Sequence, residues 1–397
     1  MSTVSERVKN ISESQTLAMA RLSREFQQKG LDVINLSLGE PDFNTPDYIK
    51  NAAKQALDDN ITKYPPVPGF LSLQKAIVTK LERDNGLQYN TNQIVVSTGA
   101  KQSLANICLS VLNPGDEVLL PAPYWVTYKE VIKLAGGIPI IIPTSIENNF
   151  KVTPQQLEEH IGPKTKMLLY SSPSNPTGSV YTENELHQIA NVLSNHPNIL
   201  IVSDEIYEHI RFEGEHHSMA QFKEVKDRVI IVNGVSKAFA MTGWRLGWIA
   251  APQEIAAACT KIQGQITSGT CTISQMAAEV ALLSDPEEID FMKEAFQKRR
   301  DLIIDLLNKI EGVKTYVPTG AFYIFPEIHF YFGKSYKEQH IHNSSDLCMY
   351  LLNEALVSTV PGDAFDSPNN IRISYAASEE TIIEAVTRIK SALEKLQ

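Results

Sequence analysis

The chain has 397 residues, 43% of them hydrophobic and 21% charged, which is ordinary for a globular protein with one large domain and a smaller companion. Its formal net charge of −10 argues against nucleic-acid binding, and the lack of any run of about 18 apolar residues argues against a membrane span. The four cysteines are scattered and the first residues are polar, so a zinc site, a disulfide framework and a signal peptide are not expected. We therefore predict a cytoplasmic protein without a bound metal.

The first 285 residues are expected to begin with a helix and to continue with alternating strands and helices. Residues 14–29 predict an amphipathic helix stopped by Gly30, and Val33–Leu38 predicts a short strand that ends in the loop Gly39–Phe43. From about residue 46 to 285, short apolar runs alternate with helical patterns. The expected strands lie near residues 94–96, 117–120, 138–142, 167–170, 200–203, 229–232 and 245–250. This repetition predicts a three-layer α/β/α fold with a mostly parallel sheet.

After about residue 286 the pattern changes. A long charged helix is expected at 286–310, strands near 323–325 and 371–374, and a last helix at 379–396. This order is typical of a smaller α+β domain. We therefore predict an N-terminal arm (1–45) that joins the small domain, a large domain (46–285) and a small C-terminal domain (286–397).

Lys237 lies in a setting that suits covalent chemistry. It follows the apolar run Val229–Val232 and a turn of small residues, and Arg245 lies further along. An amine at the end of a rigid strand, with a fixed cation nearby, suits an aldehyde cofactor such as pyridoxal phosphate (PLP), which needs an amine for its aldehyde and an anchor for its phosphate. A surface lysine after a strand is the plainer interpretation of this residue alone.

Several informative residues follow their own strands, where ligands of parallel sheets bind. They are Gly99, Trp125, Asn175, Asp204 and Lys237. Gly99 and Ala100 open a helix whose first N–H groups favour an anion, and Arg245 would add a guanidinium to a phosphate site. An ordinary N-cap turn and a surface ion pair are the alternatives. The shared position at strand ends carries the prediction better than any one residue.

The remaining candidates are polar groups near these strand ends. Asp204 follows a strongly apolar strand, where a carboxylate is costly to bury unless it meets a cation such as a protonated pyridine nitrogen. Tyr207 and Asn175 would donate to the ring oxygen, and Trp125 would stack on the ring. Helix capping explains Asp204 and turn formation explains Asn175 equally well, and an aromatic residue at the position of Trp125 is more often part of the core. Arg372 suits a substrate α-carboxylate, although an arginine at a strand edge more often faces water.

Together these motifs resemble the fold-type I PLP enzymes, specifically the class I aminotransferases. The closest likeness is to the bacterial and plastid branch of aspartate aminotransferases, which includes aspartate/prephenate aminotransferases. The likeness covers nearly the whole chain and rests on Gly39–Phe43, Lys63-Tyr64, Pro123–Val126, Ser174–Gly178, Ser203–Tyr207, the run around Lys237, and Arg372. It implies a PLP enzyme that acts on small amino and oxo acids as a homodimer with shared active sites.

The resemblance also assigns roles to individual residues. Lys237 would hold the cofactor and move the proton at the substrate Cα, and Tyr64 would reach the phosphate site of the neighbouring subunit. The other cofactor contacts would come from Gly99, Ala100, Lys101, Trp125, Asn175, Asp204, Tyr207, Ser236 and Arg245. The substrate α-carboxylate would be held by Gly39, Trp125, Asn175 and Arg372. Other branches place a phosphate-binding serine three positions before the lysine, where this chain has Gly234.

The substrate range follows from two further positions. In this branch, a lysine at the position of Lys101 is associated with the second carboxylate of dicarboxylic substrates, and a threonine at the position of Thr16 accompanies it in members that accept prephenate. The resemblance therefore implies transamination of L-aspartate and 2-oxoglutarate, and of prephenate to arogenate. A solvent-facing Lys101 is the alternative for that residue. A preference for alanine or aromatic substrates, a PLP-dependent β-lyase or decarboxylase, and a non-enzymatic regulator are alternatives for the protein, although a regulator would need a DNA-binding module.

Overall fold

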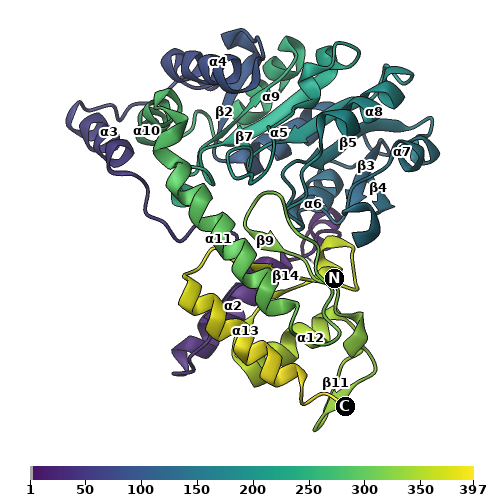
Figure 1. Ribbon diagram of the computed structural model, residues 1–397. Coiled ribbons are helices and arrows are strands. Elements are labelled where there is room, and N and C mark those ends of the chain that lie inside the picture. The colour runs from purple at the N-terminus through teal and green to yellow at the C-terminus, as the bar shows by residue number, and fades with distance from the viewer. Residues whose placement is uncertain (1–2) are drawn as a thin grey trace.

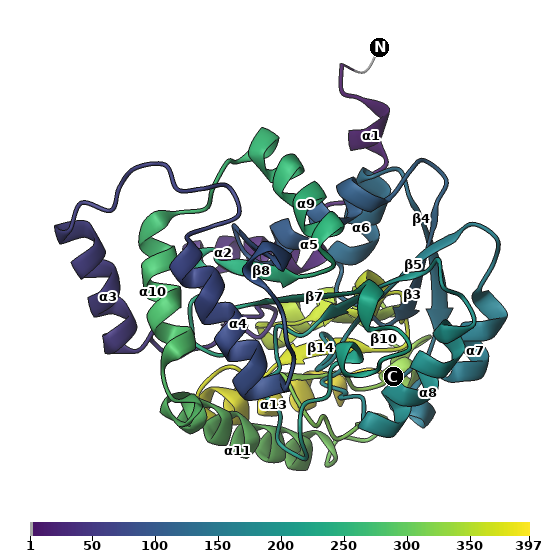
Figure 2. The same ribbon diagram turned by 90° about the horizontal axis from the view of Figure 1, so that it is seen from above.

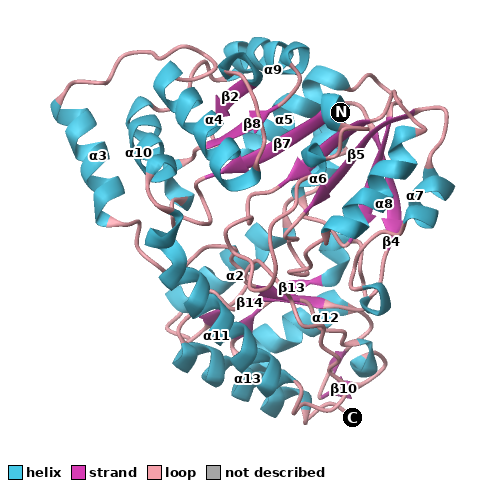
Figure 3. Ribbon diagram, turned by 45° about the horizontal axis from the view of Figure 1, so that its top comes forward, coloured by secondary structure: helices cyan, strands magenta, loops and turns pink. Residues whose placement is uncertain are grey.

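The computed structural model describes residues 3–397, and its main element is a seven-stranded sheet (Figure 3). The strand order is β2-β8-β7-β6-β5-β3-β4. Neighbouring strands run parallel except at β8, which is antiparallel to both β2 and β7. The strands are β2 (Ile94–Ser97), β3 (Glu117–Ala122), β4 (Ile138–Pro143), β5 (Thr165–Ser171), β6 (Leu200–Asp204), β7 (Val229–Gly234) and β8 (Gly247–Ala250). The predicted α/β fold is confirmed.

Helices enclose this sheet on both faces because its strands are apolar at successive positions. In β7, Val229 and Ile231 pack into the core on one face, and Ile230 and Val232 pack into the core on the other. One face is covered by α5 (Ala100–Val111), α6 (Thr127–Leu134) and α9 (Gln253–Ile266). The other is covered by α4 (Leu71–Asn85), α8 (Glu183–Ser194) and α10 (Thr272–Leu283), with α3 (Asp47–Asp58) packed on α10 and α7 (Pro154–His160) on α8.

A smaller sheet lies on the other side of the molecule (Figure 1). It is antiparallel, with the order β13-β14-β9. Its strands are β9 (Tyr323–Ile324), β13 (Val360–Pro361) and β14 (Ile371–Ser374), and the neighbouring helices are α11 (Asp290–Leu307), α12 (Ser344–Tyr350) and α13 (Glu379–Leu393). A π-helical turn, Leu351–Ala355, continues α12, and β10 (Ser335–Tyr336) pairs with β11 (Gln339–His340) as a hairpin.

The N-terminal segment lies beside this smaller sheet. Strand β1 (Ile34–Asn35) pairs in parallel with β12 (Val357–Ser358), and helix α2 (Gln15–Gln28) contacts β12 and β13. The short helix α1 (Glu6–Lys9) lies apart, against α6 of the large sheet (Figure 2). Residues 3–40 therefore touch both halves of the molecule.

Two predicted elements are shorter than expected. The strand expected over Val33–Leu38 is paired only at Ile34–Asn35. The strand expected from residue 245 begins at Gly247, because Arg245 adopts a left-handed backbone with φ +55° and follows a turn of 3-10 helix. Of the helices within residues 3–397, none combines the length and apolar character that crossing a bilayer requires.

Candidate active site

A cavity of about 260 Å³ lies at the carboxyl ends of the central strands, between the large and small sheets. Strand ends of the large sheet supply one wall, and β9, β14 and the N-terminal segment supply the other. Of the residues predicted from the sequence, the cavity is lined by Thr16, Gly39, Ala100, Lys101, Trp125, Asn175, Asp204, Tyr207, Ser236, Lys237, Arg245 and Arg372. The structure thus brings together twelve residues that are spread over most of the chain.

The other two predicted residues lie outside the lining. Gly99 is the N-cap of α5, and the guanidinium of Arg245 occupies the space that a Cβ on Gly99 would take. Tyr64 is 96% exposed, in the loop between α3 and α4, and does not line the cavity of its own chain. That position is what a residue serving a neighbouring subunit would require.

Lys237 follows the end of β7 and is half-buried. Its Nζ donates a hydrogen bond to the carbonyl oxygen of Gly39 at 2.6 Å and lies 5.8 Å from the centre of the Tyr207 ring. Burial lowers the pKa of this amine to about 8, and repulsion from Arg372 contributes in the same direction. A lowered pKa increases the neutral, nucleophilic fraction of the amine at neutral pH.

Asp204 ends β6 and is 3% exposed. The hydroxyl of Tyr128 donates to its Oδ2 at 2.7 Å, and the backbone N–H of Ile206 donates to its Oδ1 at 3.2 Å. These are neutral donors, and burial raises the pKa of the carboxyl to about 6 despite them. A carboxylate in this state gains from a cationic partner, and a protonated ring nitrogen has the required charge.

Arg372 in β14 is 1% exposed, so its guanidinium is among the most buried charges in the described chain. It donates from Nη1 to Oδ1 of Asn175 at 2.9 Å and from Nη2 to the carbonyl oxygen of Ser37 at 2.5 Å. Its Nε has no hydrogen-bond partner, and burial lowers the pKa of the group. A buried guanidinium held by neutral oxygens, with a donor left over, is ready to bind a carboxylate.

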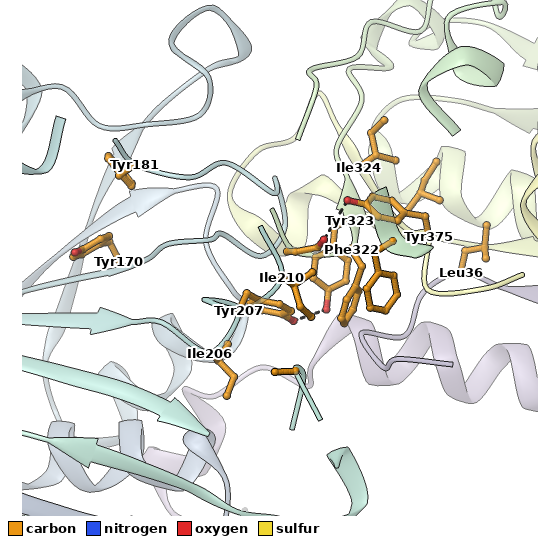
Figure 4. Packing of buried hydrophobic residues seen from close by; sticks show 14 of the residues in the cluster. Leu36, Tyr170, Tyr181, Ile206, Tyr207, Ile210, Phe322, Tyr323, Ile324 and Tyr375 are labelled. Carbon is orange, nitrogen blue, oxygen red and sulfur yellow. Dashed lines mark hydrogen bonds between the residues drawn. The ribbon is translucent and has the colours of Figure 1, made fainter. Parts of the chain in front are cut away.

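Two tyrosines close the cavity between the sheets. The hydroxyls of Tyr207 and Tyr323 lie 2.7 Å apart, and the two side chains point toward each other from opposite sides of the interface (Figure 4). The Arg372 guanidinium lies 4.6 Å from the centre of the Tyr323 ring. The tyrosine pair therefore connects the wall that carries Asp204 to the wall that carries Arg372.

The N-terminus of α5 and Arg245 form an anion site built largely from backbone. Gly99 has φ +82°, and a Cβ on it would lie 2.5 Å from Nη2 of Arg245. A Cβ on Gly247 would lie 2.4 Å from the backbone nitrogen of Ala100. Glycine at both positions lets the guanidinium and the first N–H groups of the helix approach the same point, which suits a phosphate.

Gly234, where other branches carry a serine, has no room for a side chain. A Cβ there would lie 2.9 Å from both the Cα of Gly247 and the carbonyl oxygen of Leu246, because β7 and β8 pack closely at this point. Ser236, which is buried and lines the cavity, is the serine of this turn nearest to the site. This chain therefore has no serine hydroxyl to offer at that position.

The mouth of the cavity carries a second cation. The ammonium of Lys101 lies 4.9 Å from the centre of the Trp125 ring. Partial burial lowers the pKa of Lys101, and Arg245 adds to the effect. The Oγ1 of Thr16 is buried without a hydrogen-bond partner. The Lys101 side chain is exposed overall, and its ammonium lies over the face of the Trp125 ring.

Sequence reasoning missed two tyrosines of the site. Tyr128 lies in the first turn of α6, three residues after Trp125, which precedes the N-cap Val126, and this close spacing to a predicted site residue was a usable signal. Tyr323 comes from β9 of the other sheet, and nothing in its local sequence indicates that it meets Tyr207. Both residues contact predicted site residues directly.

A buried polar network supports the strand ends from behind. Glu208 forms an ion pair with Lys80 and accepts a hydrogen bond from Nδ2 of Asn233 at 2.8 Å. Glu205 faces Nε2 of His216 at 3.0 Å. These three acidic and basic groups, Glu205, Glu208 and His216, are close enough to hold a metal, but Lys80 already neutralises Glu208. The network fixes the ends of β6 and β7, which carry Asp204 and Lys237.

The chemistry of the site matches PLP group by group. The amine of lowered pKa suits the aldehyde, and the buried carboxylate, whose hydrogen-bond donors are neutral, suits the ring nitrogen. The tyrosine hydroxyl suits the ring oxygen. The helix N-terminus and the nearby guanidinium suit the phosphate. The buried guanidinium of Arg372 remains for a substrate carboxylate. The residues present thus fit the cofactor.

Comparisons with known proteins agree with this chemistry. The family model described as aminotransferase class I and II matches residues 31–389. A bifunctional aspartate aminotransferase and glutamate/aspartate-prephenate aminotransferase of Petunia hybrida is 48% identical over 395 residues, covering 98% of this chain and 82% of the relative. An aspartate/prephenate aminotransferase of Cereibacter sphaeroides is 45% identical and covers 98% of both chains.

Solved structures show the same relationship. The aspartate aminotransferase of Rhizobium meliloti superposes with a TM-score of 0.96 at 40% identity and covers 100% of both chains. The aspartate aminotransferase of Thermus thermophilus, solved with maleate, superposes with a TM-score of 0.92 at 36% identity and covers 99% of this chain and 100% of the other. The likeness extends over both sheets and the helices between them.

Proposed function

Because this chain belongs to the class I and II aminotransferase family and its cofactor is pyridoxal 5′-phosphate, we propose that it transfers the amino group of L-aspartate to 2-oxoglutarate. The products are oxaloacetate and L-glutamate, and the same site converts prephenate to arogenate. The relatives named for aspartate and prephenate support both activities. The observation that carries the proposal is the presence of two cations in the lining of one cavity: Arg372, which is buried, and Lys101, which is exposed.

Bound PLP supplies an aldehyde for the amino group and an electron sink for the negative charge that develops at the substrate Cα. Lys237 would hold the cofactor. Once the incoming amine has displaced it, its Nζ would take the proton from the substrate Cα and deliver it to the cofactor carbon that carried the aldehyde. Its lowered pKa suits both roles. The reaction is ping-pong, since the first oxo acid leaves before the second one binds.

The other residues bind the cofactor and orient the substrate. Asp204 pairs with the ring nitrogen, Tyr207 and Asn175 hold the ring oxygen, and Trp125 packs on the ring face. The phosphate is bound at the α5 N-terminus, by Gly99, Ala100, Ser236 and Arg245, with Lys101 beside it.

The substrate is held at its two carboxylates. The α-carboxylate contacts Arg372 and Asn175, near Trp125 and the Gly39 backbone. The second carboxylate contacts Lys101, near Thr16. Two cations separated by the cavity thus select acids that carry two carboxylates.

The protein works as a homodimer in which Tyr64 completes the phosphate site of the neighbouring subunit. Large apolar side chains remain exposed near α3 and α10, which lie side by side at one edge of the molecule (Figure 2). They are Leu57, Tyr64, Ile266, Val280 and Leu283. A groove of about 780 Å³ beside Arg245 gives a second chain access to the phosphate site. Exposed apolar groups beside an open groove favour association.

Two further properties belong to this proposal. The four cysteines are free thiols, which supports a reducing, cytoplasmic location.

The proposed units of the chain are the arm (1–45), the large domain (46–285) and the small domain (286–397), and they share the cavity. The pairing of β1 with β12 supports placing the arm with the small domain.

A half-reaction titration tests the proposed substrates. The enzyme loaded with cofactor is mixed separately with aspartate, glutamate, alanine and phenylalanine, and the visible absorbance is followed. Aspartate and glutamate should convert the cofactor at much lower concentrations than alanine does. Equal responses to aspartate and alanine would contradict selection of a second carboxylate. Release of ammonia or CO₂ without amino transfer would instead indicate a β-lyase or a decarboxylase.

A further inference from the structure

Tyr128 connects two parts of the cofactor site and has no assigned role. It is 1% exposed on α6, and its hydroxyl donates to Oδ2 of Asp204 at 2.7 Å. Its ring meets the ring of Trp125 edge-on, with centroids 5.7 Å apart and planes at 88°. One side chain therefore contacts both the carboxylate and the aromatic ring that are proposed to hold the cofactor ring.

The hydroxyl supplies a hydrogen bond without supplying a charge. Burial and the neighbouring Asp204 raise the pKa of Tyr128 well above its ordinary value, so the phenol stays protonated at every working pH. The other groups that act on Asp204 are the N–H of Ile206, the carboxylate of Glu205 and the ammonium of Lys237. A lysine or arginine in place of Tyr128 would neutralise Asp204 and compete with a cationic ring nitrogen. A phenol stabilises the anion and leaves its charge available.

The ring of Tyr128 restrains Trp125. An edge-to-face contact fixes the relative orientation of two aromatic rings, because the positive edge of one faces the negative face of the other. The ammonium of Lys101 also lies over the Trp125 ring, 4.9 Å from its centre. A tryptophan held in this way presents a defined face to the cavity.

We propose that Tyr128 is a positioning residue that keeps Asp204 ionised and oriented for the cofactor ring nitrogen and holds Trp125 in place for the cofactor ring face. The proposal rests on the contacts of Asp204 and Trp125 with the cofactor described under the proposed function. Tyr128 itself acts through these two neighbours.

The test is the affinity of the apoprotein for PLP as a function of pH, measured by quenching of tryptophan fluorescence. In Tyr128→Phe the ring remains and only the hydroxyl is lost. Losing one hydrogen bond to a charged group should raise the pKa of Asp204 by about one unit. If PLP binds the ionised form, the variant should bind about fivefold more weakly than the wild type at pH 6 and within about 1.5-fold of it at pH 8. A ratio that does not change with pH would overturn the proposal.

Tyr170→Phe is the matched control. Tyr170 is also buried, and its hydroxyl accepts a hydrogen bond from Ser203 at 2.9 Å, one residue before Asp204, without contacting Asp204. Its affinity ratio to the wild type should stay flat between pH 6 and pH 8. A pH-dependent ratio in this control like that of Tyr128→Phe would show that any lost hydroxyl nearby has the same effect, and would overturn the proposal.

Two further variants separate the parts of the argument. Tyr128→Leu removes the ring as well, so it should reduce the circular dichroism that bound cofactor shows in the visible range, which Tyr128→Phe should retain. Equal signals from both variants would overturn the role toward Trp125. Asp204→Asn should bind PLP more weakly than the wild type at pH 8. Wild-type affinity in Asp204→Asn would refute the proposed cofactor contact itself, which is a different failure from a flat ratio in Tyr128→Phe.

Discussion

The buried guanidinium of Arg372 makes the sharpest test of how this site binds a substrate. In Arg372→Ala, the α-carboxylate of the substrate would lose a charged partner that is 1% exposed. Removing one member of such a pair costs about 2–5 kcal/mol, which corresponds to a decrease in kcat/KM of about 30- to 5,000-fold. The unpartnered Nε and the two bonds to neutral oxygens indicate that the guanidinium is not committed to an internal carboxylate.

Steady-state kinetics with aspartate and 2-oxoglutarate provides the assay, and Arg300→Ala provides the control. Arg300 is similarly buried at 5% exposure, and it donates to the carbonyl oxygen of Pro318 outside the cavity. Both variants lose a buried guanidinium and should lower the melting temperature, but only Arg372→Ala should lose kcat/KM by the larger factor. Values for Arg372→Ala within twofold of the wild type, or an equal loss in both variants, would refute the assignment.

Three other predictions concern the remaining charged groups. Lys237→Ala should abolish steady-state turnover and covalent trapping of the cofactor by borohydride, and near-normal turnover would contradict its catalytic role. Lys101→Ala should reduce kcat/KM for aspartate more than for alanine, and an equal reduction would count against contact with a second carboxylate. Asp204→Asn should stabilise the apoprotein at pH 7 by about 1–3 kcal/mol, because a carboxyl whose folded pKa of about 6 exceeds its ordinary 3.8 destabilises the fold increasingly as pH rises through that window. Thermal unfolding of the apoprotein at pH 4 and pH 7 checks the sign, since the gain should be small at pH 4.

The strand ends were predictable because their signal is local. Apolar runs that end in Asp204 and Lys237 indicate buried strands, and the rule that ligands bind at carboxyl ends of parallel strands then brings the two residues together. The cavity contains both. The same reasoning does not give the direction of β8, because a buried strand has the same apolar sequence pattern whether it is parallel or antiparallel to its neighbours. In the structure, residues 235–246 connect β7 to β8 and return the chain antiparallel, with Arg245 in a left-handed conformation just before β8.

The contacts between the two sheets were not predictable from one sequence. Tyr207 and Tyr323 meet across 116 positions of chain, and Arg372 reaches Asn175 across 197. Each such contact depends on how the two sheets pack against each other, which residue spacing does not encode. Asn175 was predicted as a ligand of the ring oxygen and of the substrate. Its hydrogen bond to Arg372 adds a partner that local motifs could not reveal.

The glycines around the phosphate site have a consequence for how this enzyme can be altered. At Gly234 and Gly247 an added methyl group would meet backbone atoms at 2.9 Å or less, and at Gly99 the φ of +82° strains any other residue, so replacement along this wall is costly. The mouth is different, because Thr16 and Lys101 project from the first turns of helices and can be exchanged without disturbing a strand. Laboratory evolution toward new acceptors should therefore accumulate changes at the mouth while the phosphate wall stays invariant.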